Sequence, residues 1–406
     1  MDDCQLYSAL LELKSPWKVD RVSLDSTKKT VEIYIIHDKG SKLLCPDCKK
    51  ACMVYDHLKE RVWRDLDSID FMTFIHAKPP RISCTEHGIR EAIMPWTEKT
   101  SRFSLRFETR SIKMLQHMDT YNFTGIMRLS WSQAWNILDR AVKRGRERKR
   151  GKPSVIGVDE KSYRKGHKYI TLIYDMDGSG VDYISMDRKK KSLDEYYNTL
   201  TEDQRSSITA VSMDMWDPFM SSTMEYVPDA GSKIVFDRFH VMKHINGAVD
   251  ITRKEENRML SADGRDELKG TRYVWLYSSE NLPDKYREKY LELKKSDLLT
   301  GKAYSMKENI RNLWNAPTLE DARRYWNNWY SWVIHSSISA MKDVARMMKV
   351  HLGRILNYFI HRITNARAEG INSKIALIEK MAYGYRNQEH LKTAIYFRCG
   401  NLDLYP

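Results

Sequence analysis

Residues 154–160 read SVIGVDE, a short apolar run that ends in two carboxylates. Such a run, rich in Val and Ile, predicts a buried β-strand. Two further strands follow it, joined by a Gly-Ser-Gly turn typical of an antiparallel hairpin, and a helix over 192–200 precedes two more. In chain order the five predicted strands are Ser154–Val158, Tyr169–Asp175, Val181–Met186, Ile208–Met213 and Lys233–Phe236. A hairpin followed by a β-α-β connection predicts a mixed α/β sheet.

The region after this sheet is predicted to be helical. Residues 241–360 contain almost no strand signal and hold five of the eleven tryptophans, at positions 275, 314, 326, 329 and 332. We interpret them as a helical insertion. Its tryptophans fit either a self-contained core or a contact with a second copy of the chain. The last predicted helix, His361–Lys380, carries Glu369.

Composition limits the classes of protein to which the chain can belong. It has 406 residues, 68 Lys and Arg against 54 Asp and Glu, and a formal net charge of +14. That surplus favours a polyanionic partner, nucleic acid first and acidic membrane second. A hydrophobic fraction of 42% argues against global disorder. Without an apolar run of 18 residues, and with the start MDDCQLYSALLELKSPW, we expect neither a membrane span nor a secretory signal.

Four of the six cysteines fall within 40 positions and indicate a metal site in a reducing cytoplasm. Cys45 and Cys48 form a C-x2-C knuckle, and Cys84 and His87 form a C-x2-H knuckle. Two such knuckles on separate hairpins can close a tetrahedron around a structural Zn²⁺. Cys52 competes as the fourth ligand, and His57 and His76 are more distant alternatives.

A helix-turn-helix is predicted before the sheet. Residues 121–126 and 130–140 suit two helices with a break near Arg128. Ser130 would cap the second helix, with Gln133 completing a capping box. We expect Trp135 and Leu138 to pack inward while the polar side chains face DNA base edges. These expected base-contacting residues are Ser132, Gln133 and Asn136.

The run KRGRERKRGK, residues 143–152, looks like an exposed basic linker between domains. Its cations would contact DNA phosphates and add affinity without sequence choice. A merely solvated charged linker is the alternative reading. The residues concerned are Lys143, Arg144, Arg146, Arg148, Lys149 and Arg150.

Three acidic residues occupy informative positions. Asp159 closes the first predicted strand, Asp214 closes the fourth, and Glu369 lies on the helix after the insertion. If the two strands are neighbours, their ends bring the aspartates together, and a crossing helix can add Glu369. Three carboxylates can hold two Mg²⁺ or Mn²⁺ ions about 3.5–4 Å apart for phosphodiester chemistry. Taken singly, such residues are more often caps or solvated side chains.

Four segments together resemble the DDE transposases of bacterial insertion sequences, specifically the ISL-three type. They are Gly157–Glu160 (GVDE), Ser212–Phe219 (SMDMWDPF), Phe236–His240 (FDRFH) and Asn365–Lys374 (NARAEGINSK). The resemblance covers nearly the whole chain, with the zinc region, helix-turn-helix and catalytic domain in the family's order. It implies an RNase H-like fold, interrupted by the helical insertion, in which Asp159, Asp214 and Glu369 match the catalytic triad.

The resemblance also implies supporting residues. Asp237 and His240 match a motif after the fifth strand, as neighbours of the metal ligands or as DNA contacts; the alternative is a helix cap and a packed histidine. Asn365, Glu369 and Asn372 share one helical face that is expected to look into the active site, with Lys374 nearer DNA phosphate. One departure is His87, because the family usually has a second C-x2-C knuckle there.

The sequence therefore predicts a DNA transposase. It would bind the terminal inverted repeats of its element, cleave DNA with Mg²⁺ (or Mn²⁺), and transfer a strand to target DNA. We expect a homodimer or larger assembly on double-stranded DNA, in the bacterial cytoplasm at the nucleoid. The alternatives are an RNase H-like nuclease without strand transfer, and a zinc and helix-turn-helix regulator with an inactive catalytic domain. The predicted divisions are 1–97 (zinc module), 98–150 (helix-turn-helix and linker), 151–245 (first catalytic part), 246–355 (insertion) and 356–406 (last catalytic part).

Overall fold

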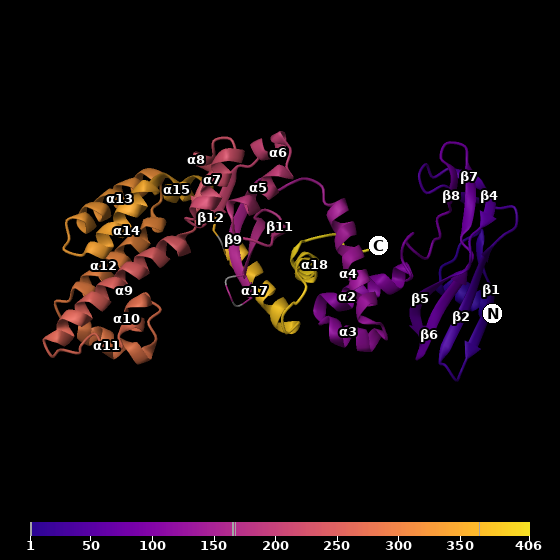
Figure 1. Ribbon diagram of the computed structural model, residues 1–406, viewed down its shortest axis with the longest axis horizontal. Helices are drawn as coiled ribbons and strands as arrows, with labels where there is room; N and C mark the ends of the chain where they lie inside the picture. Colours follow the sequence, from indigo (N-terminus) through magenta and orange to yellow (C-terminus); the bar gives the residue numbers. More distant parts are fainter. Residues whose placement is uncertain (1, 165, 167, 365) are drawn as a thin grey trace. The chain divides into compact units, whose positions relative to one another are not determined.

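The computed structural model describes residues 2–164, 166, 168–364 and 366–406, and the chain forms two compact units (Figure 1). Unit 1 comprises Met1–Lys149, Glu379–Arg398 and Leu402–Pro406; unit 2 comprises Arg150–Ile378 and Cys399–Asn401. The boundary after Lys149 falls within the basic run. The expected last catalytic part, 356–406, is divided between the units. Residues 379–398 belong to unit 1 because they pack against its helices: the ring of His390 stacks on Trp135 with centroids 3.9 Å apart.

Unit 1 begins with a short helix and two four-stranded sheets, of order β1-β2-β6-β5 and β3-β4-β7-β8. Buried and partly buried residues alternate along β2 and β6, which directs one face of the first sheet into a core. The Trp96 ring lies in that core, edge-on to Trp17 and Trp63 at 5.0 and 5.8 Å. The elements are α1 (Asp3–Leu10), β1 (Trp17–Asp25), β2 (Thr30–His37), β3 (Lys42–Leu44), β4 (Ala51–His57), β5 (Arg61–Ser68), β6 (Phe71–Ala77), β7 (Pro80–Cys84) and β8 (Gly88–Glu91).

Three helices follow the sheets in unit 1: α2 (Leu105–His117), α3 (Thr120–Met127) and α4 (Trp131–Arg148). The predicted break between the last two is confirmed, because Arg128 adopts the left-handed conformation with φ of 53° and ends α3. Ser130 caps α4 and forms the predicted capping box with Gln133. Helix α18 (Gln388–Cys399) completes the bundle for most of its length.

Unit 2 is built on a five-stranded mixed sheet of order β11-β10-β9-β12-β13. Strand β10 is antiparallel to both of its neighbours, β9 and β11, and β12 is parallel to both β9 and β13. The mixed α/β sheet is therefore confirmed. Its elements are β9 (Val155–Arg164), β10 (Lys168–Asp175), β11 (Gly180–Ser185), α5 (Lys190–Asn198), α6 (Glu202–Ser206), β12 (Ala210–Met213), α7 (Asp217–Tyr226), α8 (Ala230–Lys233) and β13 (Ile234–Phe236).

The expectation that Asp159 closes the first strand is wrong. Strand β9 runs on to Arg164 because β10 continues to pair with it, placing Leu172 opposite Asp159 and Tyr169 opposite Ser162. On its other edge the parallel pairing with β12 stops at Gly157. Asp159 thus lies beyond the end of the parallel ladder while still held in an antiparallel one.

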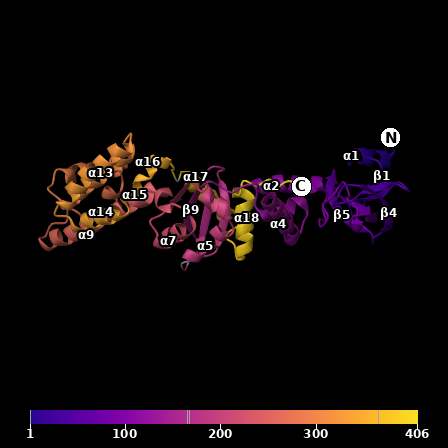
Figure 2. The same cartoon turned by 90° about the horizontal axis from the view of Figure 1, so that it is seen from above.

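The predicted helical insertion is present (Figures 1 and 2). Four of its five tryptophans are buried, and Trp332 is 44% exposed. Its buried residues belong to the same apolar cluster as the strands of the sheet, with α9 supplying Val241 and Ile245. The helices are α9 (Arg238–Ala262), α10 (Arg272–Leu276), α11 (Asp284–Lys294), α12 (Leu299–Ile310), the 3₁₀ helix η1 (Arg311–Asn315), α13 (Leu319–Ile334), α14 (Ser339–Val350), α15 (Leu352–Leu356) and α16 (Tyr358–His361), followed by α17 (Ala366–Met381).

Buried charged groups join the helices of the insertion to one another. The Lys307 ammonium, 1% exposed, donates to the carbonyl oxygens of Trp275, Leu276 and Tyr277 at 2.7, 3.3 and 2.8 Å. It therefore satisfies acceptors at the C-terminus of α10 that have no partner within that helix. The Glu256 carboxylate does the converse at the N-terminus of α12, where it accepts from the backbone of Leu299 and Thr300.

Lys307→Met is expected to destabilise the insertion by about 2 kcal/mol, because one buried and two partly buried carbonyl groups lose their donor. Thermal unfolding followed by circular dichroism measures the loss. Lys302→Met, on the same helix with a side chain 54% exposed, is the matched control and should change stability little. Equal melting temperatures for the two variants would contradict the role given to Lys307.

The same lysine gives a pH dependence. Burial lowers the pKa of Lys307 to about 8 from an ordinary value of 10.5. Between these values the unfolded chain binds more protons than the folded one, so this group makes folding more favourable as pH rises from about 8 to 10.5. This rise in the free energy of unfolding from about pH 8 to 10.5 should be present in the wild type and absent from Lys307→Met.

Candidate active site and metal centre

The predicted pair of aspartates is aligned by strand pairing. Strand β12 lies parallel to β9 with Ser212 opposite Gly157. Asp214 and Asp159 each follow these partners by two residues, so both lie just beyond the carboxyl end of the parallel ladder. Ligand sites in open α/β sheets form at this edge. Both side chains are partly buried.

A histidine holds the Asp214 carboxylate. His240 Nδ1 lies 3.0 Å from Asp214 Oδ2, and its Nε2 lies 3.9 Å from Asp237 Oδ2. The second oxygen of Asp214 accepts from the backbone of Met215 at 2.6 Å. Asp237 is the N-cap of α9 and accepts from the backbone of Phe239. The structure therefore places His240 against one predicted catalytic residue and gives Asp237 the capping position.

An asparagine from α17 holds the other aspartate. The Asn372 amide donates to Asp159 Oδ2 at 2.8 Å, and its oxygen accepts from the Tyr174 hydroxyl at 2.7 Å. The other oxygen of Asp159 accepts from the backbone of Glu160 at 2.8 Å. These bonds bring a helix that follows the whole insertion onto the first strand of the sheet.

Glu369 lies on α17 one turn before Asn372, the spacing at which side chains share a helix face. Its side chain and that of Lys374 are exposed. Within the described chain, the three predicted catalytic carboxylates do not form a group whose ligand atoms all lie within 4.8 Å of one another. The predicted supporting residue Asn365 falls outside the described residues.

The electrostatics of the two aspartates differ. Burial raises the pKa of Asp159 above its ordinary value, although Asn372 and His240 act against this shift. Burial acts on Asp214 in the same direction, but the hydrogen bond and charge of His240 outweigh it and its pKa is lowered. For His240 burial lowers the pKa, and the bond to Asp214 raises it above its ordinary value overall. The pair thus favours a charged histidine and a charged Asp214.

Two residues of this site were missed by the sequence reasoning. Tyr174 orients Asn372. Its position on the neighbouring predicted strand was the available sign in the sequence that it belongs to the site. Glu160 follows Asp159 on β9. Its Oε1 lies 3.7 Å from the Arg188 guanidinium, and its buried Oε2 has no hydrogen-bond partner within the described structure. Burial raises the pKa of Glu160; the charge of Arg188 opposes this shift, and the charges of Asp214 and Asp159 add to it. Its place in the GVDE segment was the available signal.

The zinc ligands predicted from the two knuckles come together in unit 1. Cys45, Cys48, Cys84 and His87 each offer an atom, and all four atoms lie within 4.8 Å of one another. Cys48 Sγ is 3.6 Å from Cys84 Sγ, and His87 Nδ1 is 3.6 and 4.0 Å from the sulfurs of Cys84 and Cys45. Zn–S bonds of about 2.3 Å in a tetrahedron require sulfurs about 3.8 Å apart, so the cluster fits Zn²⁺.

The competing zinc ligands lie outside the four-residue cluster. Cys52 lies outside the four-residue cluster and contacts the carbonyl of Lys50 at 3.5 Å. His57 Nε2 lies 2.8 Å from His37 Nε2, and His76 lies between two glutamates. The bond with His87 lowers the pKa of Cys84 to about 6, which favours the thiolate that zinc requires.

The predicted base-reading face of α4 is exposed. Ser132, Gln133 and Asn136 are open to solvent, while Trp135 and Leu138 are buried as predicted. Gln133 uses its side-chain oxygen in the capping box, where it accepts from the backbone of Ser130 at 2.8 Å. Its amide nitrogen thus remains the group that can face a base edge.

The basic run is not a linker through most of its length, because residues 143–148 are the last turns of α4. Arg144 was predicted to contact a DNA phosphate, but its side chain is buried and already paired. It is 8% exposed and pairs with Glu98 and Glu108 at 2.5 and 3.2 Å. Arg148 pairs with Asp403 at 3.1 Å, and the Arg146 guanidinium lies 4.7 Å from the Tyr396 ring. Lys143 and Arg150 are exposed.

Three sequence-family models match the chain in the order of these sites. A model described as a transposase matches residues 156–395, more than half of the chain. A zinc-finger of transposases IS204, IS1001, IS1096 and IS1165 matches residues 42–87. A helix-turn-helix domain of transposase family ISL3 matches residues 92–142.

Curated relatives match along most of their length. The transposase for insertion sequence element IS1001 of Bordetella parapertussis is 27% identical over 391 residues, covering 94% of this chain and 95% of the relative. The transposase for insertion sequence element IS1557 of Mycobacterium tuberculosis is 25% identical over 378 residues, covering 86% and 83%. No helix in the described chain is long and apolar enough to cross a membrane.

Cys45→Ser is expected to remove zinc from the N-terminal module and to open residues 41–95 to protease, because a three-ligand site no longer closes the two hairpins. Metal analysis of the purified chain and limited proteolysis measure both effects. Cys52→Ser is the matched control and should keep the full zinc content. Purified wild-type protein without zinc would overturn this assignment.

Proposed function

The chain belongs to the ISL3 family of insertion-sequence transposases, and we propose that it cuts DNA at the ends of its element and joins them to target DNA. The proposal assigns the catalytic roles to Asp159, Asp214 and Glu369. The observation that carries it is the alignment of the two aspartates by β9 and β12, with α17 bonded to Asp159 through Asn372.

The sheet supports an RNase H-like catalytic fold. A three-stranded antiparallel sheet extended by two parallel strands, with the acidic pair at the end of the parallel ladder, agrees with that expectation. Glu369 enters from a helix after the insertion, and its exposed side chain lies one turn from Asn372. The proposal requires that the Glu369 carboxylate reach the pair when metal and DNA are bound.

The residues at this edge fit a hard divalent cation. Asp159 is a partly buried carboxylate, and burial raises its pKa above the ordinary value. A cation bound to it would offset this cost of burial. We propose that Asp159, Asp214 and Glu369 hold Mg²⁺ or Mn²⁺, for which carboxylate oxygens are suitable ligands. When bound, such ions activate the attacking oxygen and stabilise the leaving oxygen in phosphodiester displacement.

The neighbouring side chains orient the two aspartates. His240 fixes one oxygen of Asp214, and Asn372 fixes one oxygen of Asp159. Each carboxylate also accepts from the backbone amide of the residue after it. These bonds hold the carboxylates in place before substrate arrives, which limits the rearrangement needed during reaction.

The N-terminal unit supplies DNA binding in this proposal. The helix-turn-helix would place the exposed residues Ser132, Gln133 and Asn136 in the major groove of the inverted repeat. In the basic run, Lys143 and Lys149 of unit 1 and Arg150, the first residue of unit 2, remain the proposed phosphate contacts, together with Arg146 and Arg148. Two ends must be held together for joining, so we propose a dimer or larger assembly on DNA.

Asp159→Asn, Asp214→Asn and Glu369→Gln should each lower joining of a pre-cut element end to a plasmid by about 100- to 1000-fold, the effect of losing one group that stabilises the transition state. End binding, measured by gel shift, should be unchanged. Glu202→Gln on α6 removes a carboxylate outside the site and is the matched control.

The same assay separates the alternatives. Cleavage by the wild type without any joined product would favour a nuclease. End binding with neither cleavage nor joining, unchanged in Asp159→Asn, would favour a regulator with an inactive catalytic domain. Full activity of Glu369→Gln would remove that residue from the triad and leave the aspartate pair.

A further inference from the structure

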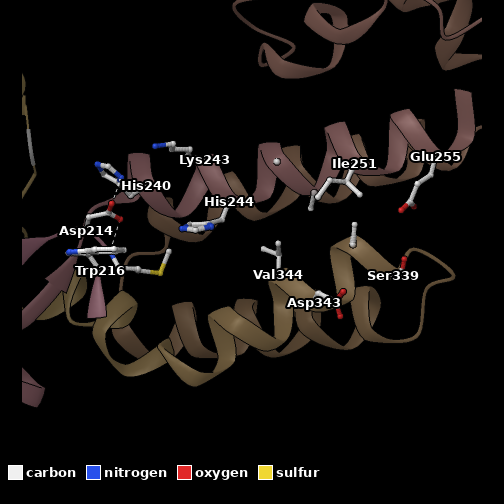
Figure 3. A pocket seen from close by; sticks show the side chains of 14 residues that line it. Asp214, Trp216, His240, Lys243, His244, Ile251, Glu255, Ser339, Asp343 and Val344 are labelled. Atoms are coloured by element: carbon white, nitrogen blue, oxygen red, sulfur yellow. Dashed lines mark hydrogen bonds and ion pairs between the residues drawn. The ribbon is translucent and has the colours of Figure 1, made fainter. Parts of the chain in front are cut away.

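A groove leads from Asp214 along helix α9, and we propose that it binds unpaired nucleotides of the DNA strand next to the scissile phosphate. The groove lies between α9 and α14 and encloses a cavity of about 590 Å³ (Figure 3). It begins at Asp214 and Trp216 and ends near Glu255 and Ser339. This inference rests on the proposed function, because it supposes that DNA is cut at Asp214.

Small side chains open this groove. Gly247 faces it from the middle of α9, and a Cβ added there would meet no atom within 4 Å. Glycine inside a helix costs about 1 kcal/mol relative to alanine, so the open space comes with a cost to the helix. Ala248 and Ala340 continue the narrow floor, and Ile251, 48% exposed, forms an apolar wall. An apolar floor with room for a flat group suits a nucleobase.

The charges along the groove are unequal. His240, Lys243 and His244 line the end next to Asp214, and Figure 3 shows the His244 ring pointing into the space between the helices. Glu255 lies at the opposite end, as does Asp343, which pairs with Arg346 at 3.0 Å. Lys243 is the cation at the end next to Asp214, because His240 is already paired with Asp214. A phosphate is therefore favoured beside Lys243 and disfavoured near Glu255. A short strand that enters at Asp214 fits this pattern, whereas a long single strand does not.

An aromatic ring stands at the entrance. Trp216 is 39% exposed, and its backbone amide donates to the Asp214 carbonyl at 2.8 Å, which fixes the turn that carries it. Figure 3 shows its indole beside Asp214. A base in duplex DNA already stacks on its neighbours, while an unpaired base has a face available for an indole. Trp216 and the groove therefore select unpaired nucleotides over duplex.

Together these contacts give the position of the bound nucleotides. A base stacked on Trp216 would extend toward Gly247, with its phosphate near Lys243 and His244. On α9, residues 240 to 255 span about 22 Å at 1.5 Å per residue, so the half of the groove that contains Lys243 holds a strand of only a few nucleotides. Trp216, Lys243 and His244 are thus positioning residues that fix the strand, and no step of the chemistry is assigned to them.

Binding of two DNA probes tests the inference with the full-length chain and without added divalent metal. One probe is a blunt duplex, and the other is the same duplex with a three-nucleotide single-stranded overhang that carries 2-aminopurine. The wild type should bind the overhang probe at least about fivefold more tightly, as stacking of one base predicts. The fluorescence of 2-aminopurine should fall on binding.

Two variants should remove this preference while leaving binding of the blunt duplex unchanged. Trp216→Ala removes the stacking face, and Gly247→Leu fills the groove at a position with open space. Their matched controls are Trp332→Ala, another exposed tryptophan, and Gly301→Leu, a glycine of α12 with equal open space. Both controls should keep the preference.

The inference is overturned if the wild type binds the two probes equally, or if the preference survives in both groove variants. It is also overturned if Gly247→Leu changes only the oligomeric state, measured by light scattering, because the groove would then be a protein contact. The readout is binding without metal, so failure here leaves the joining assay of the proposed function untouched. Loss of joining alone would not affect this result.

Discussion

The parallel pairing of β12 with β9 is the constraint on which the site depends. It fixes Ser212 opposite Gly157 and so places Asp214 and Asp159 at one level of the sheet. Two carboxylates at that level repel one another and lose hydration, which is unfavourable unless positive charge or donors compensate. The surrounding elements supply that compensation: α9 contributes His240, and α17 contributes Asn372. The sheet positions the two carboxylates, and the helices offset the unfavourable free energy of placing them close together.

Helix α9 joins the site to the insertion. It starts at the Asp237 cap beside His240 and continues into the helical region, where Val241 and Ile245 belong to one apolar cluster with the strands. The insertion is therefore not a loosely attached module. Four of its tryptophans are buried, which favours the self-contained core over a contact surface for that set. Trp332 is the exception, with nearly half of its surface open.

The sequence allowed the strands, the zinc ligands and the capping box to be predicted because each depends on local patterns. Alternating or apolar runs predicted the strands, and the two-residue spacing between ligands predicted the zinc knuckles. Ser130 with Gln133 predicted the N-cap of the second helix. The end of the first strand was predicted wrongly at Asp159, because its continuation depends on pairing with β10 rather than on its own residues. Arg144 was misjudged for a similar reason. Its partners Glu98 and Glu108 are distant in sequence, so charge alone predicted exposure. The bond between Tyr174 and Asn372, which are 198 residues apart, had no local signal.

The three carboxylates of the proposed triad differ in how firmly the surrounding structure holds them. Asp159 and Asp214 are each fixed by a backbone amide and a side chain, whereas the Glu369 side chain is exposed on α17. Asn372, one turn along that helix, is the connection between α17 and Asp159. A bond from a neutral amide to a carboxylate is modest in strength, so it can anchor the helix without fixing the rotamer of Glu369.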